Sequence, residues 1–274
     1  TNSWDARSIW LFKAKEFFYD HSIASIKDNY AEFSHNNYPS IAPAFAAGLS
    51  TIIGHWNEIY PKSGLTLMFI PPLIIISRFF NNNFFLISVS IILFVIGKFL
   101  VNGELDGLVA LYFVSSTIII YNLKNLNNDI FYQCLILIFF LMILSFLKNE
   151  GSVLLLCTFI GSLFIFFKKK YLYKNLIISF FVSIIPILVW NYFCIYNNIG
   201  NTNSSNFFNI SDFLSRIFYL KNYVLIFDYL LLNEKFLFSL IIFLLSVIYM
   251  KNKDIFVYVS SISLIYILFL FIVY

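Results

Sequence analysis

Long apolar runs separated by short polar turns make up most of this chain of 274 residues. They lie at about residues 40–56, 65–80, 84–100, 107–122, 130–147, 152–167, 175–196, 236–250 and 255–274. The alternating pattern of a lipid-facing β-strand is absent, and helices are the other way to satisfy every backbone amide in hydrocarbon. The pattern therefore predicts an all-α fold, a polytopic bundle of transmembrane helices.

Two stretches interrupt this pattern. Residues 1–38 are polar, but apolar side chains recur in them at roughly helical spacing, which predicts a short amphipathic helix on the membrane surface. These side chains are Ile9, Trp10, Phe12, Phe17 and Phe18. Residues 197–212 are rich in Asn and Ser, and 213–232 form a weaker apolar segment that we expect to rest on the outer face.

Composition narrows the class of protein further. Hydrophobic residues make up 60% of the chain and charged residues 12%, with a mean hydropathy of +0.83. A soluble domain typically has about 45–50% apolar and about 25% charged residues. These values exclude a soluble enzyme, a disordered chain and a nucleic-acid-binding domain. The three cysteines all fall in apolar runs and are expected to be small buried hydrophobic residues: Cys134, Cys157 and Cys194.

The expected organisation is a single membrane domain over residues 1–274. It comprises an external loop with a juxtamembrane helix (1–38), core helices (40–196), an external loop with a surface helix (197–232) and C-terminal helices (236–274). The chain begins with Thr and stops while still apolar, which favours a fragment of a longer protein.

The placement of the basic residues predicts the orientation. The most positive short loop, Lys168–Lys174, should be cytoplasmic. Counting crossings from it places the turns at 103–106 and 148–151 outside. Resting 213–232 on the outer face is preferred, because Lys251 and Lys253 then return to the inside. Whether 40–56 crosses fully or inserts partly stays open.

An ionisable residue near a membrane is a functional candidate, because burying its charge is costly. The candidates on the predicted outer face are Asp5, Arg7, His35, Glu104, Asp106, Lys148 and Glu150. Asp5 lies between Trp4 and Trp10, so partial desolvation would make it a stronger base. The alternative is that Asp5 caps the helix that follows.

The other candidates have equally ordinary alternatives. His35 could bind phosphate or move a proton, or could be a loop histidine beside the interfacial anchor Tyr38. Asp106 either caps the helix it opens or joins Glu104 in binding a sugar hydroxyl or a divalent metal.

The turn at Lys148 and Glu150 joins two strongly apolar segments. Lys148 could neutralise a phosphate, and Glu150 could act as an acid or bind a sugar. The alternative is a helix hairpin whose charges lie among the lipid headgroups.

These pieces occur in a recognisable order. Trp4-Asp5-Ala6-x-x-Ile9-Trp10 is followed by His35-x-x-Tyr38-Pro39, by Asp106 opening a membrane helix, and by Lys148-x-Glu150-Gly151. This order resembles the type C polytopic glycosyltransferases, in particular the family 39-like branch related to protein O-mannosyltransferases and aminoarabinose transferases. The resemblance covers about residues 4–190.

The resemblance implies a polyprenyl-phosphate sugar donor, a glycan, lipid or protein acceptor, and a site on the outer face of a bacterial inner membrane. Asp5 matches an acidic residue near the start of the first external loop and would be the catalytic base. Asp106 matches the second external acidic position, and Lys148 and Glu150 match the Lys-x-Glu-Gly turn. Many relatives have an Asp-Glu pair where this chain has Asp5 and Ala6, so a mechanism with two carboxylates is not expected.

The chemistry needs few groups. Phosphate is already a good leaving group, so it needs only positive charge nearby, from Arg7 or Lys148. The acceptor hydroxyl needs one base, and a single displacement with inversion would use one carboxylate. His35 and Tyr38 would complete the substrate-binding set. No cofactor is expected, although a divalent metal is possible.

Two other functions remain open. An O-antigen ligase or polymerase-like membrane enzyme would place its catalytic charge in the later loop, near Arg216. A transporter or flippase for lipid-linked sugars would show inverted repeats and charges near the bilayer midplane.

Overall fold

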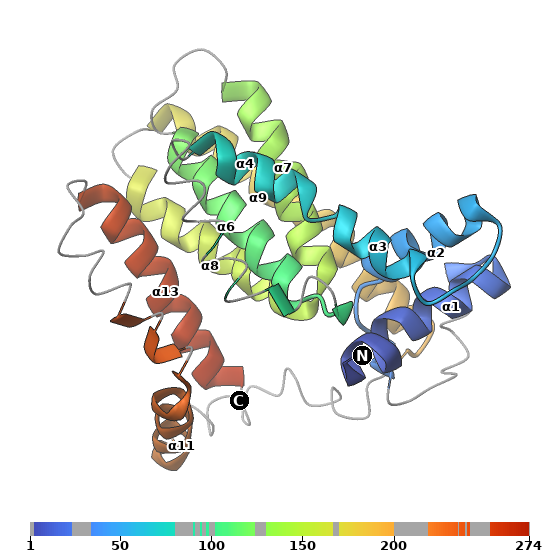
Figure 1. Ribbon diagram of the computed structural model, residues 1–274. Coiled ribbons are helices and arrows are strands. Elements are labelled where there is room, and N and C mark those ends of the chain that lie inside the picture. Colours follow the sequence, from blue (N-terminus) through green and yellow to red (C-terminus); the bar gives the residue numbers. More distant parts are fainter. Residues whose placement is uncertain are drawn as a thin grey trace. The chain divides into compact units, whose positions relative to one another are not determined.

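In this computed structural model, the described residues are 3–23, 34–79, 90, 94, 97–98, 102–123, 130–166, 170–199, 219–234, 236–238, 240–241 and 253–273. Over these residues the regular structure is entirely helical, which confirms the expected all-α class (Figure 1). The chain forms two compact units. The first comprises Thr1–Leu155 and Tyr171–Thr202, and the second Leu156–Lys170 and Asn203–Tyr274.

Among the described residues, four helical segments are long and apolar enough to cross a membrane, as expected for a membrane protein. They are Tyr60–Phe79, Asp106–Leu123, Ile130–Leu147 and Leu172–Tyr196. Helix α2 (Ile41–Ile53) has 13 residues, whereas a crossing needs about 20. Its length thus favours partial insertion for 40–56. The predicted segments at 84–100 and 236–250 lie largely outside the described residues.

The N-terminal region forms a π-helical turn, η1 (Ala6–Trp10), followed by α1 (Leu11–Asp20). The predicted amphipathic helix is therefore present, and its expected position on the membrane surface stays a prediction. Helix α1 packs on α2 and α3 (Tyr60–Leu67), so protein covers most of its apolar face. The buried side chains of α1 are Leu11, Lys13, Ala14 and Phe17.

The span Tyr60–Phe79 is broken into α3 and α4 (Ile70–Phe79), and it begins five residues before the predicted run at 65–80. Two consecutive prolines explain the break, because Pro72 has no N–H to donate to the carbonyl of Met68, four residues earlier. The hydroxyl of Tyr112 donates to that carbonyl instead, at 3.1 Å.

Tyr112 belongs to α6 (Asp106–Leu123), which packs against α4 and against α7 (Ile130–Leu147). Helices α8 (Asn149–Phe166) and α9 (Lys170–Tyr196) follow. Serines lie between neighbouring helices, where small side chains allow close approach and donate across the interface. Ser183 of α9 donates to the carbonyl of Ile138 at 3.3 Å, and Ser152 of α8 donates to that of Ser145 at 3.3 Å.

The second unit contains α11 (Leu220–Leu232) and α13 (Lys253–Val273), which contact each other. Helix α11 confirms that the weaker segment 213–232 is helical over 220–232. Within the same unit, the part of α8 around Gly161 lies so close to Ile262 of α13 that a Cβ at 161 would clash with that side chain. Cys134, Cys157 and Cys194 are buried, as predicted, and form no disulfide bond.

Candidate functional site

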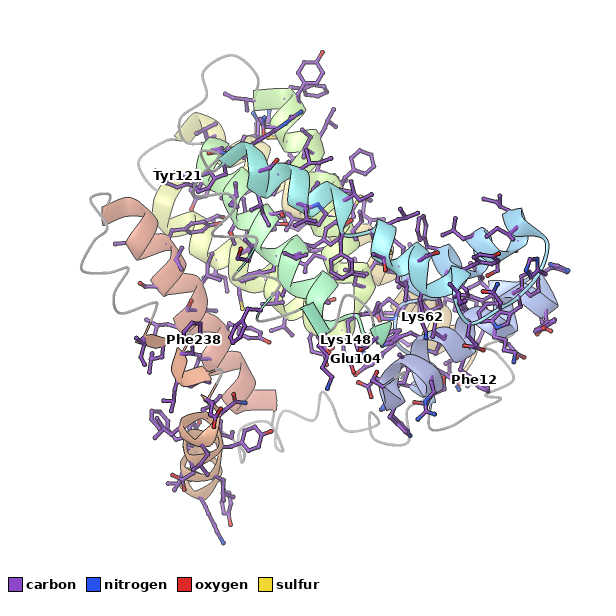
Figure 2. The ribbon with its side chains drawn as sticks, in the orientation of Figure 1. Phe12, Lys62, Glu104, Tyr121, Lys148 and Phe238 are labelled. Carbon is purple, nitrogen blue, oxygen red and sulfur yellow. The ribbon has the colours of Figure 1, made fainter. Side chains whose placement is uncertain are left out.

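Lys148 is the single residue between α7 and α8, and its ammonium group is placed between two carboxylates. Its Nζ lies 2.9 Å from Oδ1 of Asp106 and 3.5 Å from Oε1 of Glu150, and 16% of its side chain is exposed. Because Asp106 begins α6, this ion pair brings the start of α6 to the end of α7. The two turns predicted to share one side of the membrane therefore meet, and Figure 2 labels Lys148 and Glu104 among the side chains of this unit.

The surroundings of Lys148 keep it charged. Burial disfavours the ammonium form, but the carboxylates of Glu150 and Asp106 outweigh burial, and the Tyr38 phenol adds to their effect. Together they raise the pKa of Lys148 above its ordinary value. The second carboxylate oxygen of Glu150, Oε2, is buried and has no hydrogen-bond partner among the described residues. The site thus contains a permanent cation and a carboxylate oxygen with unused acceptor capacity.

The surroundings of Gly151 explain why the Lys-x-Glu turn ends in a residue without a side chain. A Cβ at this position would overlap the backbone carbonyl oxygen of Leu144, in the last turn of α7. The missing side chain lets the first turn of α8 approach α7. Glu150 and Gly151 are therefore helical residues of α8 rather than part of a loop, and this close approach returns Glu150 toward Lys148.

Replacing Gly151 with alanine is expected to destabilise the hairpin of α7 and α8, because the backbone must move away from Leu144. Overpacking of this kind typically costs about 1–3 kcal/mol. Thermal unfolding of the purified protein in detergent would show a lower midpoint than wild type. Gly48→Ala is the matched control, because a Cβ at 48 meets no atom within 4 Å. An equal midpoint for Gly151→Ala and Gly48→Ala would contradict the close approach.

The turn at residues 34–38 brings aromatic side chains to Lys148. The backbone of His35 is left-handed, with φ of 47°, and its carbonyl accepts the N–H of Tyr38 at 2.9 Å. The Tyr38 ring stacks on His35 at 5.1 Å and on Trp10 at 5.5 Å between centroids. Trp190 of α9 donates its indole N–H to the carbonyl of Asn37 at 2.8 Å. This turn therefore links the N-terminal helix to α9 and to the ion pair.

Asp5 lies in the first turn of the N-terminal helix, half-buried, and makes no capping hydrogen bond with its side chain. Ser3 provides the cap, since its Oγ accepts the N–H of Ala6 at 3.2 Å. The capping alternative for Asp5 is thus wrong. Ala6 lies close to Gly103, since a Cβ added to Gly103 would be 3.3 Å from the Cβ of Ala6. Asp5 is consequently adjacent to a residue that touches the turn before α6, whereas Arg7 is exposed.

Lys13 was not among the residues that the sequence pattern pointed to. This lysine is fully buried, and its Nζ donates to the carbonyl of His35 at 2.6 Å. Burial lowers its pKa to about 7, while the Cys194 thiol acts in the opposite direction. The signal was its spacing, because Lys13 falls three residues after Trp10 and four before Phe17, on the stripe that faces the protein.

Metal binding finds no further support within the described parts of the chain. They contain no group of three or more His, Cys, Asp or Glu side chains arranged to hold a metal ion. Asp106, which one alternative placed with Glu104 in such a site, is paired with Lys148.

Comparison with known proteins does not add to this picture. No protein-family model, curated protein or solved structure matches the chain. The relation to type C glycosyltransferases therefore stays an expectation from short motifs.

Proposed function

We propose that this protein is a membrane glycosyltransferase of the type C kind. It would transfer a sugar from a polyprenyl-phosphate donor to an acceptor hydroxyl at the outer face of the membrane. One observation carries the proposal: Lys148 is paired with Asp106 and Glu150, beside Tyr38, where α6 begins and α7 ends. The helix that bears Asp5 packs against the turn leading into α6.

Each group has one task in the transfer. Asp5 accepts the proton of the acceptor hydroxyl, whose oxygen forms a bond to the anomeric carbon of the donor sugar. The bond between that carbon and the phosphate oxygen breaks, and its electron pair leaves with the polyprenyl phosphate. Lys148 stabilises the charge that develops on the phosphate, with Arg7 as a second, exposed cation. No cofactor enters the scheme.

The remaining groups bind and orient substrate. Asp106 and Glu150 keep the Lys148 ammonium in place, and the Asp106 carboxylate, 47% exposed, can also accept a hydrogen bond from a sugar hydroxyl. Tyr38 and His35 present aromatic and polar atoms at the same end of the unit. The isoprenoid tail of the donor would lie in lipid beside the spanning helices, with its phosphate at the level of Lys148.

The positions of the charges favour an enzyme over a transporter. In the four candidate spans, each Asp, Glu, Lys and Arg lies in the first or last turn: Lys62, Arg78, Asp106 and Lys174. A transporter is expected to place charges near the bilayer midplane. Arg216, on which the ligase alternative depends, lies outside the described residues.

The direct test supplies radiolabelled donors to the purified full-length protein in lipid vesicles. The donors are polyprenyl-monophosphate hexoses and pentoses, with the matching sugar nucleotides as controls, and a membrane extract serves as acceptor. We expect release of polyprenyl phosphate together with a labelled product, from the lipid-linked donor only. Movement of the intact donor across the vesicle without product would instead support a flippase.

A further inference from the structure

We propose that Lys13 is a positioning residue of this site. Its buried amino group fixes the turn at 34–38 in the conformation that places Tyr38 beside Lys148. This role rests on the proposed function, because the turn at 34–38 is part of an active site only if the protein transfers sugar. The contact between Lys13 and the turn can be tested without any sugar transfer.

Lys13 and the turn meet at one backbone atom. The carbonyl oxygen of His35 accepts both the Nζ of Lys13, at 2.6 Å, and the N–H of Tyr38, at 2.9 Å. Lys13 belongs to α1 and lies 22 residues before its acceptor. Its side chain therefore ties the turn to a helix whose apolar face is packed against α2 and α3.

The backbone of His35 needs such support. A left-handed conformation is unfavourable for a residue with a Cβ, and it persists where the surroundings determine it. His35 has φ of 47°, and its ring stacks on Tyr38 at 5.1 Å with an interplanar angle of 18°. Tyr38 in turn stacks on Trp10 with an interplanar angle of 8°. A change in the backbone at His35 would thus move the phenol that faces Lys148.

Burying a lysine at position 13 lowers the free energy of unfolding unless its amino group makes a compensating hydrogen bond. The stripe formed by Trp10, Ala14 and Phe17 would accept an apolar residue, whereas burying an amine disfavours its charged form. Burial lowers the pKa of Lys13 to about 7. The hydrogen bond to His35 is therefore assisted by charge at acidic pH and weakens as pH rises through neutrality.

Titratable groups lie on every element around Lys13 except α2. Cys194 on α9 is the one whose charge acts on Lys13. Arg7 lies on η1, Tyr60 and Lys62 lie on α3, His35 and Tyr38 lie in the turn itself, and α2 carries none between Ile41 and Ile53. On α1 the titratable neighbours are Lys15, Glu16, Tyr19 and Asp20.

The test compares Lys13→Met with Lys15→Met, which removes an exposed lysine from the same helix. Hydrogen exchange of the peptide at 34–40 should be at least tenfold faster in Lys13→Met than in wild type and unchanged in Lys15→Met. Because Met fills similar space without a buried amine, the unfolding temperature of Lys13→Met should equal or exceed that of wild type. The kcat for transfer should fall by at least tenfold.

A second variant, Lys13→Gln, separates positioning from packing. The glutamine amide can donate to the His35 carbonyl but does not titrate between pH 6 and 8. Protection of 34–40, corrected for intrinsic exchange, should be partly restored and should not show the decline with rising pH that we expect of wild type. These measurements still decide the inference if Lys13→Met does not fold.

Two results would overturn the inference. One is wild-type protection of 34–40 in both Lys13 variants. The other is equal loss of protection throughout the unit, which would make Lys13 a general packing residue. If the wild-type protein transfers no sugar from any donor, the proposed function fails, while the exchange data still report whether Lys13 fixes the turn.

Discussion

Sugar transfer by the Asp5→Asn variant is expected to be slower than wild type by about 10²–10⁴-fold, the usual contribution of a general base. Asparagine keeps the shape of the side chain but cannot accept the proton of the acceptor hydroxyl. The loss should appear in kcat, because proton transfer occurs in the transition state, with little change in the KM for the donor. Initial rates of labelled product formation at several donor concentrations measure both constants.

The structure supplies a matched control for Asp5. Ser3, two residues earlier, caps the helix through a hydrogen bond from Ala6 at 3.2 Å. Ser3→Ala should lower stability by about 1 kcal/mol, as loss of a cap does, and leave transfer within a few-fold of wild type. If Asp5→Asn and Ser3→Ala behaved alike, Asp5 would be a structural residue and the base would lie elsewhere.

Removal of the Lys148 ammonium should have the second largest effect. Lys148→Met is expected to reduce kcat by roughly 10²–10³-fold, as loss of a preorganised charge at a developing anion does. It also leaves the carboxylates of Asp106 and Glu150 facing each other without a cation. We therefore expect a lower unfolding temperature as well, measured on the same preparations.

Two further variants separate these effects for Lys148. In Lys148→Met with Asp106→Asn the remaining pair is a carboxylate and an amide, so stability should recover while transfer stays low. Lys174→Met removes a lysine near the other end of α9, about 24 Å along the helix from Trp190, and should leave transfer unchanged. Recovery of transfer in the double variant would show that Lys148 only neutralises Asp106.

The fold class followed from simple patterns. The apolar run at 130–147 predicted α7 with the bounds that the structure shows. An uninterrupted apolar run of this length satisfies its backbone hydrogen bonds in lipid by forming one continuous helix. The run at 65–80 was placed less well. Pro71 and Pro72 break the helix, and the hydroxyl of Tyr112 satisfies a carbonyl that the break leaves without its donor. That compensation comes from another helix and cannot be read locally.

Part of the candidate site was also predictable. Counting crossings from the lysine-rich loop placed Asp106 and Lys148 on one side of the membrane, and their 2.9 Å ion pair confirms that they share an end of the helical unit. Which side of the membrane this end faces stays a prediction. The position of α1 at the membrane surface also stays a prediction, and its apolar stripe did not reveal that α2 and α3 would pack against it.

Hydrophobic periodicity and charge placement were thus enough to establish that this chain is helical and membrane-embedded, and which turns carry its sparse charges. These properties depend on periodicity and on the transfer of side chains into lipid, and both act locally. Three features emerged only from the packing of the helices: Lys148 pairs with Asp106, Gly151 allows α8 to approach α7, and Lys13 is buried against the turn at His35. Each of these contacts joins helices or turns that the chain brings together from separate segments, so its energy exists only after the helices have packed.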